Sequence, residues 1–254
     1  MGKLTEEQKL RYARHLALQE AGEEGQEKLL NGKVLIIGAG GLGSPAAMYL
    51  AAAGVGTLGI ADADVVDLSN LQRQIAHGTA DLGRAKAESV RETITEMNPD
   101  VEVRAYQMFV GEENIMGLLE GYDFVIDATD NFPSKFRIND ACVRAGKPFC
   151  HAGILRFQGQ LMTYVPGEGP CYRCIFKNPP PEEAVPSCRQ AGIIGAMAGV
   201  IGSLQAMEAI KYLLGAGELL TGKLLIYDAL KMEFRTVKLP RHVPDCPVCG
   251  KLPA

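Results

Sequence analysis

Residues 33–45 read KVLIIGAGGLGSP, and this stretch decides the fold. The continuous apolar run Lys33–Gly38 is typical of a central strand in a parallel sheet. Gly38, Gly40 and Gly43 then follow at GxGxxG spacing, before an alanine-rich helix. Between a strand and a helix, such glycines let backbone N–H groups approach phosphate oxygens. The stretch therefore predicts a nucleotide-binding α/β unit.

Strands and helices alternate after this unit. We expect a strand over residues 57–62, a helix over 84–97, and strands over 101–106, 122–128 and 148–153. Gly22 and Gly25 suggest two helices between residues 5 and 30. This alternation predicts a Rossmann-like, doubly wound and mainly parallel sheet.

The second half of the chain differs in pattern. Strands are expected over residues 160–165, 223–227 and 234–239, with a long helix after residue 192. These strands would extend the sheet with mixed or antiparallel pairing. No Gly- or Ser-rich linker separates the halves, so we expect one domain over residues 1–254. Its parts would be N-terminal helices over 1–30, a nucleotide-binding half over 31–155 and a second half over 156–254.

Composition excludes several function classes. The 254 residues carry a formal net charge of -4, with 47% hydrophobic and 22% charged residues, which is typical of a soluble globular protein. No basic footprint for nucleic acid or an anionic membrane is present. The N-terminus lacks the apolar core of a signal peptide, so we expect a cytoplasmic protein. The uncharged segment 191–207 is too short to span a bilayer, so it should be a buried core helix.

Four cysteines form two CxxC pairs, Cys171 with Cys174 and Cys246 with Cys249. Two such pairs can supply the tetrahedral sulfur shell that Zn²⁺ prefers, which predicts a structural zinc site. A disulfide remains the alternative, although a reducing compartment disfavours it.

The remaining cysteines divide into two groups. Cys142 and Cys150 are expected to be buried in the core, because free cysteine packs as a small hydrophobe. His151, next to Cys150, is given the same structural interpretation. Cys188 differs, since it precedes the N-terminus of the long predicted helix and is followed by Arg189. Both features favour a thiolate there.

Several charged residues indicate that the bound nucleotide is a triphosphate rather than a dinucleotide. Asp62 ends the second strand, where a carboxylate can accept hydrogen bonds from ribose hydroxyls. Arg73 and Lys86 could neutralise a departing pyrophosphate. Asp130 follows the strand over 122–128, at the sheet edge where a Mg²⁺ ligand would face phosphates. Each charge alone could be a surface residue, but together with the glycine loop they favour ATP.

The sequence resembles the ThiF/MoeB/HesA family, bacterial relatives of ubiquitin-activating enzymes, over nearly its whole length. The matching stretches are RYARHL at 11–16, GAGGLGS at 38–44, the segment 62–74 with SNLQRQ, Lys86, ATDN at 128–131, both CxxC pairs, and GSLQAMEAI at 202–210.

The resemblance implies an ATP-dependent adenylyltransferase that uses Mg²⁺ and carries Zn²⁺. Its substrate would be a ubiquitin-like sulfur carrier, ThiS-like or MoaD-like, that ends in Gly-Gly and serves thiamine or molybdopterin biosynthesis. The carrier's carboxylate would attack the α-phosphorus of ATP, giving an acyl-adenylate and pyrophosphate. Residues 156–254 would bind the carrier.

The resemblance also implies roles for individual residues. Asp130 would hold Mg²⁺, Arg73 and Lys86 would contact phosphates, and Asp62 would contact the ribose. The same nucleotide site would include Gly41, Asn70, Gln74 and Asn131. Arg14 would reach the ATP of a neighbouring subunit, which makes a homodimer the expected active unit.

The role of Cys188 stays open. In ThiF-like members a cysteine at this place becomes covalently linked to the carrier, whereas MoeB-like members do not need it for adenylation. Few residues follow Cys249, so we expect sulfur to come from a separate donor protein.

Other functions remain possible from the sequence. The first half also fits an NAD-dependent oxidoreductase, for which His151 is the best acid/base candidate. A family relative could adenylate a small molecule or a modified tRNA base, and a non-enzymatic scaffold is the least favoured alternative. Nothing in the sequence selects the carrier.

Overall fold

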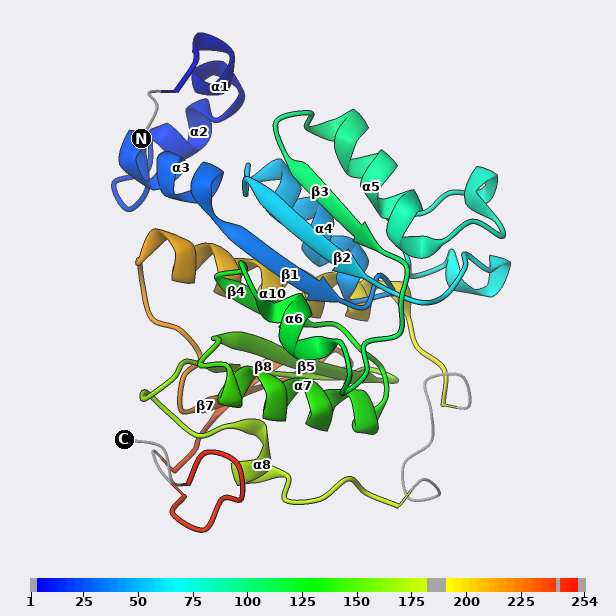
Figure 1. Ribbon diagram of the computed structural model, residues 1–254, viewed down its shortest axis with the longest axis vertical. Coiled ribbons are helices and arrows are strands. Elements are labelled where there is room, and N and C mark those ends of the chain that lie inside the picture. Colours follow the sequence, from blue (N-terminus) through cyan, green and yellow to red (C-terminus); the bar gives the residue numbers. More distant parts are fainter. Residues whose placement is uncertain (1–3, 182–190, 241–242, 251–254) are drawn as a thin grey trace.

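The computed structural model describes residues 4–181, 191–240 and 243–250 (Figure 1). Its strands form one eight-stranded sheet in the order β3-β2-β1-β4-β5-β6-β7-β8. The strands are β1 (Lys33–Ile37), β2 (Thr57–Ala61), β3 (Glu102–Tyr106), β4 (Phe124–Asp127), β5 (Phe149–Leu155), β6 (Gln158–Tyr164), β7 (Lys223–Asp228) and β8 (Glu233–Lys238). The helices are α1 (Glu6–Arg11), α2 (Ala13–Leu16), α3 (Gly22–Asn31), α4 (Gly43–Ala52), α5 (Lys86–Met97), α6 (Ile115–Leu119), α7 (Phe132–Arg144), α8 (Tyr172–Ile175) and α10 (Gly195–Leu214), with short 3-10 turns η1 (Leu68–Asn70) and η2 (Thr79–Asp81).

The predicted fold class is confirmed. Strands β1 to β5 pair in parallel, and β6, β7 and β8 extend the sheet in antiparallel fashion. The chain runs outward from β1 through β2 to β3, then returns to place β4 on the other side of β1. The loops after β1 and β4 therefore diverge at a topological switch point, where doubly wound sheets bind ligands.

Helices cover both faces of the sheet (Figure 1). Alternate residues of β1 point to opposite faces, so Val34 and Ile36 join one core while Leu35 and Ile37 join the other. The first core packs under α4, α5 and α10, and the second under α6 and α7. Burial on both faces explains why the central strands are continuous apolar runs.

The long helix α10 is a core helix, as its sequence predicted. It packs on α4 and on β4, β5 and β6. Gly202 permits this approach, since a Cβ there would meet the backbone carbonyl of Leu42. Its buried Gln205 donates to the carbonyls of Asp127 and Cys150, at 2.8 and 3.2 Å. Within the described ranges, no helix combines the length and apolarity needed to cross a membrane.

The prediction for the N-terminal helices was wrong in one respect. The segment forms three helices, and Gly25 lies inside α3 rather than in a turn. A Cβ at Gly25 would lie 3.0 Å from a methyl carbon of Leu214 at the end of α10. Gly25 therefore serves close helix–helix packing, which a local reading of glycine as a turn signal does not capture.

Cys142 on α7 and Cys150 on β5 are both fully buried, as expected. Burial raises the pKa of each thiol, so neither is a thiolate at neutral pH. Their structural interpretation is confirmed.

Candidate active site

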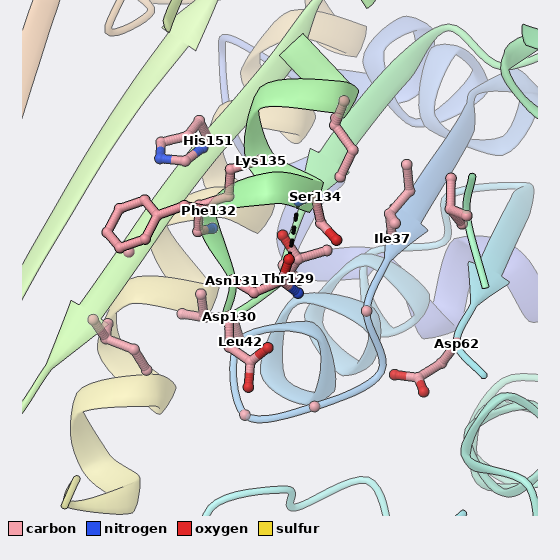
Figure 2. Close-up of a pocket in the computed structure, with 18 of the residues that line it drawn as sticks. Ile37, Leu42, Asp62, Thr129, Asp130, Asn131, Phe132, Ser134, Lys135 and His151 are labelled. Atoms are coloured by element: carbon pink, nitrogen blue, oxygen red, sulfur yellow. Dashed lines mark hydrogen bonds between the residues drawn. The ribbon is translucent and has the colours of Figure 1, made fainter. Parts of the chain in front are cut away.

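A cavity of about 880 Å³ lies at the switch point and continues along the sheet to β5 and β6. The glycine loop after β1 and the loop after β4 form one part of its wall. Figure 2 shows Asp62 on one side of the cavity, and His151 with Lys135 on the other. Gly153 and Gln160 belong to the wall that β5 and β6 supply. One cavity therefore joins a nucleotide-type loop to an extended sheet surface.

Backbone-to-backbone packing shapes the glycine loop. Gly38 has a φ of +102°, and a Cβ there would lie 2.8 Å from the carbonyl oxygen of Ala128. A Cβ at Gly43 would collide with the carbonyl of Gly38. Gly38 therefore lets the loop after β1 lie directly against the loop after β4, and Gly43 lets the same loop turn tightly on itself.

Replacing Gly43 with alanine is expected to lower the free energy of unfolding by about 1–3 kcal/mol, since the added methyl must displace backbone. ATP binding should weaken as well. Gly117 is the matched control, because it lies in α6 with nothing within 4 Å of an added Cβ. Gly117→Ala should be neutral or stabilising by up to about 1 kcal/mol. Urea unfolding of both variants checks the contrast, and equal losses would contradict it.

Asp62 fixes the glycine loop from the neighbouring strand. Its Oδ2 accepts a hydrogen bond from the backbone N–H of Ala39 at 2.7 Å, and its Oδ1 accepts from that of Asp64 at 2.8 Å. His77 contacts the same loop residue, since Nε2 of its buried ring lies 3.0 Å from the carbonyl oxygen of Ala39. Burial lowers the pKa of His77, so the neutral ring donates there through Nε2–H. No motif in the sequence pointed to His77.

Two of the predicted cations lie beside this loop. The Lys86 ammonium is nearly buried and pairs with the exposed carboxylate of Asp64 at 2.9 Å. Both line the cavity, so a phosphate oxygen could replace Asp64 as the partner of Lys86. Arg73 donates from Nη1 to the carbonyl of Ser69 at 3.0 Å, and its stem packs beside Gly41.

The backbone of Asn70 holds the segment that carries Arg73 and Gln74. Its carbonyl accepts from the N–H groups of Arg73 and Gln74, each at 3.0 Å. Gln74 is buried in the cavity wall, and its Oε1 finds no hydrogen-bond partner among the described residues.

Asp130 is an exposed carboxylate on the loop after β4. The loop is held from below by Asp127, whose Oδ1 accepts from the backbone N–H and the hydroxyl of Thr129 at 3.0 and 2.7 Å. Asn131 is committed to the next helix, since its Oδ1 accepts from the N–H of Ser134 at 2.9 Å and caps α7 (Figure 2). Asp130 is thus presented to the cavity by a fixed loop, and its oxygens suit Mg²⁺.

The cavity wall also holds a buried polar cluster that the sequence analysis missed, formed by Asp127, His151 and Lys135. Asp127 ends β4 and is the register partner of His151 on β5. The Asp127 Oδ2 lies 2.7 Å from His151 Nδ1 and 3.5 Å from Lys135 Nζ. All three side chains are at least nine-tenths buried.

Charge states within this cluster follow from its geometry. Burial would raise the pKa of Asp127, but the Lys135 ammonium and the hydrogen bond from His151 outweigh burial and hold it well below its usual range. Burial, reinforced by Lys135, lowers the pKa of His151. The cluster therefore contains a carboxylate, an ammonium and a neutral imidazole.

The structure brings most of the predicted site residues together. Those that line the cavity are Gly38, Gly40, Gly41, Asp62, Arg73, Gln74, Lys86, Asp130 and Asn131. Gly43 and Asn70 support the wall from behind it, as described above. Arg14 is exposed on α2 and does not belong to the cavity lining. Cys188 lies outside the described residues.

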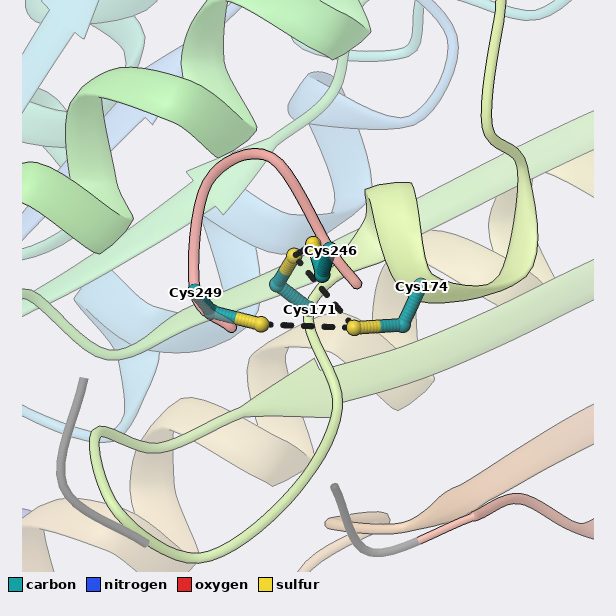
Figure 3. A group of neighbouring side chains, drawn as sticks. All are labelled: Cys171, Cys174, Cys246 and Cys249. Atoms are coloured by element: carbon teal, nitrogen blue, oxygen red, sulfur yellow. Dashed lines mark hydrogen bonds between the residues drawn. The ribbon is translucent and has the colours of Figure 1, made fainter. Parts of the chain in front are cut away.

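The four cysteines of the CxxC pairs converge, as Figure 3 shows. Their sulfur atoms all lie within 4.8 Å of one another, and neighbouring ones are 3.3, 3.6 and 3.8 Å apart. Tetrahedral coordination with Zn–S bonds of about 2.3 Å places sulfurs at similar separations, so the cluster fits Zn²⁺. The thiols influence one another: the hydrogen bond from Cys174 lowers the pKa of Cys171, the same hydrogen bond raises the pKa of Cys174, and burial raises that of Cys249.

Comparison with known proteins gives the family. The model described as the ThiF family matches residues 12–248. The chain is 48% identical over 241 residues to the SAMP-activating enzyme E1 of Haloferax volcanii, covering 95% of this chain and 88% of that protein. It is 47% identical over 250 residues to the adenylyltransferase and sulfurtransferase MOCS3 of Mus musculus.

Coverage differs between these relatives. The MOCS3 match takes in 98% of this chain but 54% of MOCS3, so the chain spans about half of that protein. Among solved structures, E. coli MccB with ATP superposes with a TM-score of 0.83 at 25% identity, covering 94% of this chain and 74% of MccB.

Proposed function

The chain belongs to the ThiF family, and from that premise we propose that it adenylates the C-terminal carboxylate of a ubiquitin-like sulfur carrier ending in Gly-Gly. The chain is a nucleotidyltransferase, the class to which its named adenylyltransferase relatives belong. ATP is the proposed nucleotide, since a solved relative was crystallised with it.

One observation carries the proposal. A single cavity contains the glycine loop, two cations and Asp130, and then continues to the walls of β5 and β6. An adenylation site must hold ATP and a second substrate in line, and this cavity provides adjoining places for both. A nicotinamide coenzyme would not require Lys86, Arg73 and Asp130 together at its phosphates.

The reaction needs positioning and charge neutralisation rather than a nucleophilic side chain. The carrier's carboxylate oxygen attacks the α-phosphorus of ATP, and the bond from that phosphorus to the bridging oxygen breaks, which releases pyrophosphate. Lys86 and Arg73 would stabilise the charge that develops on the phosphate oxygens. Asp130 would hold Mg²⁺, which when bound neutralises the leaving pyrophosphate.

Residues 156–254 are the proposed carrier-binding half. Strand β8 is exposed along its whole length at the edge of the sheet. Leu230 and Met232 in the turn before β8, and Phe234 in β8, are large apolar side chains that are between 51% and 74% exposed. An exposed edge strand with apolar side chains beside it is a common docking surface for a partner protein.

A homodimer is proposed as the active unit, with Arg14 reaching the partner's ATP. Tyr49 on α4, Met207 on α10 and Ile75 are all more than half exposed, which fits a surface covered in an assembly. Sedimentation equilibrium should give twice the mass of the chain, and a monomer at working concentration would exclude this arrangement.

Further parts of the function are proposals about partners and pathway. Sulfur would come from a separate donor protein in the cytoplasm, and the pathway would be that of thiamine or of molybdopterin. Cys188 would form a covalent link to the carrier during sulfur transfer if the chain works as ThiF-like members do.

Exchange of labelled pyrophosphate into ATP tests the proposal. The protein with Mg-ATP should catalyse exchange only when a ThiS-like or MoaD-like carrier ending in Gly-Gly is present, and the more active carrier identifies the pathway. Cys188→Ala should retain full exchange, because adenylation precedes any thiol chemistry. Absence of exchange with both carriers, together with tighter binding of NAD than of ATP, would favour an oxidoreductase instead.

A further inference from the structure

The polar cluster of Asp127, His151 and Lys135 is not explained by ATP binding. His151 on β5 and Lys135 on α7 lie across the cavity from Asp62 (Figure 2), and Asp127 ends β4 between them and the glycine loop. Asp127 and Lys135 pair with each other, but His151 Nε2 has no partner among the described residues, and this unmet hydrogen bond beside a cavity points to a ligand. The hydrogen-bonding groups of the cluster that have no partner indicate the chemistry of that ligand.

His151 lines the cavity and carries an unpaired hydrogen-bond acceptor. Its Nδ1 lies against the Asp127 carboxylate, so a neutral ring carries its proton there and leaves a lone pair on Nε2. The Nε2 atom is buried and has no hydrogen-bond partner in the part of the chain that the structure describes. The ring is fixed from the other side by Tyr172, with ring centroids 4.1 Å apart. An unpaired buried acceptor is unfavourable, and a ligand N–H would relieve the cost.

Lys135 offers a donor with a positive charge. Its ammonium donates to the carbonyl of Ala152 at 2.6 Å and lies 3.5 Å from the Asp127 carboxylate. An ammonium has three N–H donors, so these two partners leave one for a ligand. Because Lys135 lines the cavity, that ligand can be an anionic oxygen.

We propose that His151 and Lys135 together bind the C-terminal glycine of the carrier tail, an inference that rests on the proposed adenylation of such a tail. Nε2 of His151 accepts the N–H of the last peptide bond, and Lys135 binds the terminal carboxylate. His151 through Nδ1 and Lys135 through Nζ both lie against Oδ2 of Asp127, so the two side chains are neighbours in the cavity wall and can contact the same ligand residue.

Asp127 is the positioning residue of this arrangement. One of its oxygens orients His151 and lies beside Lys135, while the other holds Thr129 at the start of the Asp130 loop. The carboxylate of the tail and the Asp130 loop are thereby positioned by the same side chain. The attacking group is thus placed relative to the loop that would carry the metal ligand.

The first test measures how each variant changes the KM for carrier and the KM for ATP in pyrophosphate exchange. Lys135→Met should raise the KM for carrier about tenfold or more, and leave ATP affinity without carrier within about twofold. Lys147→Met is the matched control, because Lys147 also donates to a backbone carbonyl, that of the buried residue Tyr122 at 2.7 Å, but lies outside the cavity lining. A rise in the KM for ATP alone would overturn the proposal and assign Lys135 to phosphate.

The second test changes the tail instead of the protein. Carriers are made by ligation with a C-terminal carboxamide, or with N-methylglycine as the last residue. The carboxamide should bind wild type about tenfold more weakly, yet bind Lys135→Met as well as the normal tail. N-methylglycine should weaken carrier binding to wild type but not to His151→Leu. In His151→Gln the difference in affinity between the normal and the N-methylated tail should be partly restored.

The outcomes separate this inference from the proposed function. The tail site would be refuted, and adenylation left intact, if wild type exchanges pyrophosphate but the variants lose as much affinity for both altered tails as wild type does. Wild type without exchange on any Gly-Gly carrier would refute the proposed function itself. Thermal melting and ATP binding of every variant establish that the cluster substitutions leave the protein folded.

Discussion

Replacing Asp130 with alanine is expected to abolish carrier-dependent pyrophosphate exchange, with a loss of about 10²–10³-fold or more. Asp130 is the exposed carboxylate that the Thr129–Asn131 loop presents to the cavity, while Asp127 and the cap on α7 hold that loop from both sides. Its removal takes away the proposed ligand of Mg²⁺ without disturbing a buried contact. The rate should fall while the melting temperature stays unchanged.

Glu120→Ala is the control for this prediction. Glu120 is also an exposed acidic residue, but it lies at the end of α6 and outside the cavity lining. Exchange rates are measured over a range of Mg²⁺ concentrations for both variants. An Asp130→Ala protein with exchange close to that of wild type would remove Asp130 from the reaction, and equal losses in both variants would show a general charge effect.

The double substitution Cys246→Ser and Cys249→Ser is expected to eliminate bound zinc and lower the melting temperature by about 5 °C or more. These two cysteines join the 243–250 segment to Cys171 and Cys174, and the cluster is part of the second core. Tyr172 follows Cys171 directly and packs on His151, so loss of the metal should also raise the KM for carrier. Elemental analysis and calorimetry measure the first two effects.

Cys142→Ala serves as the matched substitution. Cys142 is fully buried in the same core but contributes no sulfur to the cluster. It should keep one zinc per chain and lose about 1 kcal/mol or less of the free energy of unfolding. Wild-type protein purified without zinc, and insensitive to chelators, would contradict the structural zinc site.

Local sequence signals were sufficient to place the glycine loop and Asp62 together in the cavity wall. Gly38, Gly40 and Asp62 each sit at the end of a recognisable apolar strand, and the parallel order of β1, β2 and β4 brings such ends to one edge. The cysteine pairs were equally predictable, because metal coordination imposes a spacing that sequence displays directly. Both predictions rest on motifs whose residues are only a few positions apart in the sequence.

The Asp127 cluster could not be predicted in the same way. Asp127 was read as part of a buried strand and His151 as a structural residue, and their contact depends on the register of β4 with β5. Lys135 joins them only because α7 packs over those strands. One signal was present, since an aspartate at the end of the apolar strand Phe124–Asp127 requires a buried partner.

The Gly25 error has a related cause. The residue is a packing glycine in α3 because Leu214 approaches it from a helix that begins some 170 residues later. No local window contains that neighbour. Gly25 is therefore explained by helix–helix packing and not by a turn.

The most direct measurement of the central claim is the intact mass of the carrier after incubation with this protein and Mg-ATP. The account predicts a carrier whose mass has grown by one adenylyl group on the C-terminal glycine, formed by wild type, lost with Asp130→Ala, and reversed by added pyrophosphate. A Gly-Gly carrier that stays unmodified while ATP is bound, or an adenylyl group attached at another residue, would contradict it.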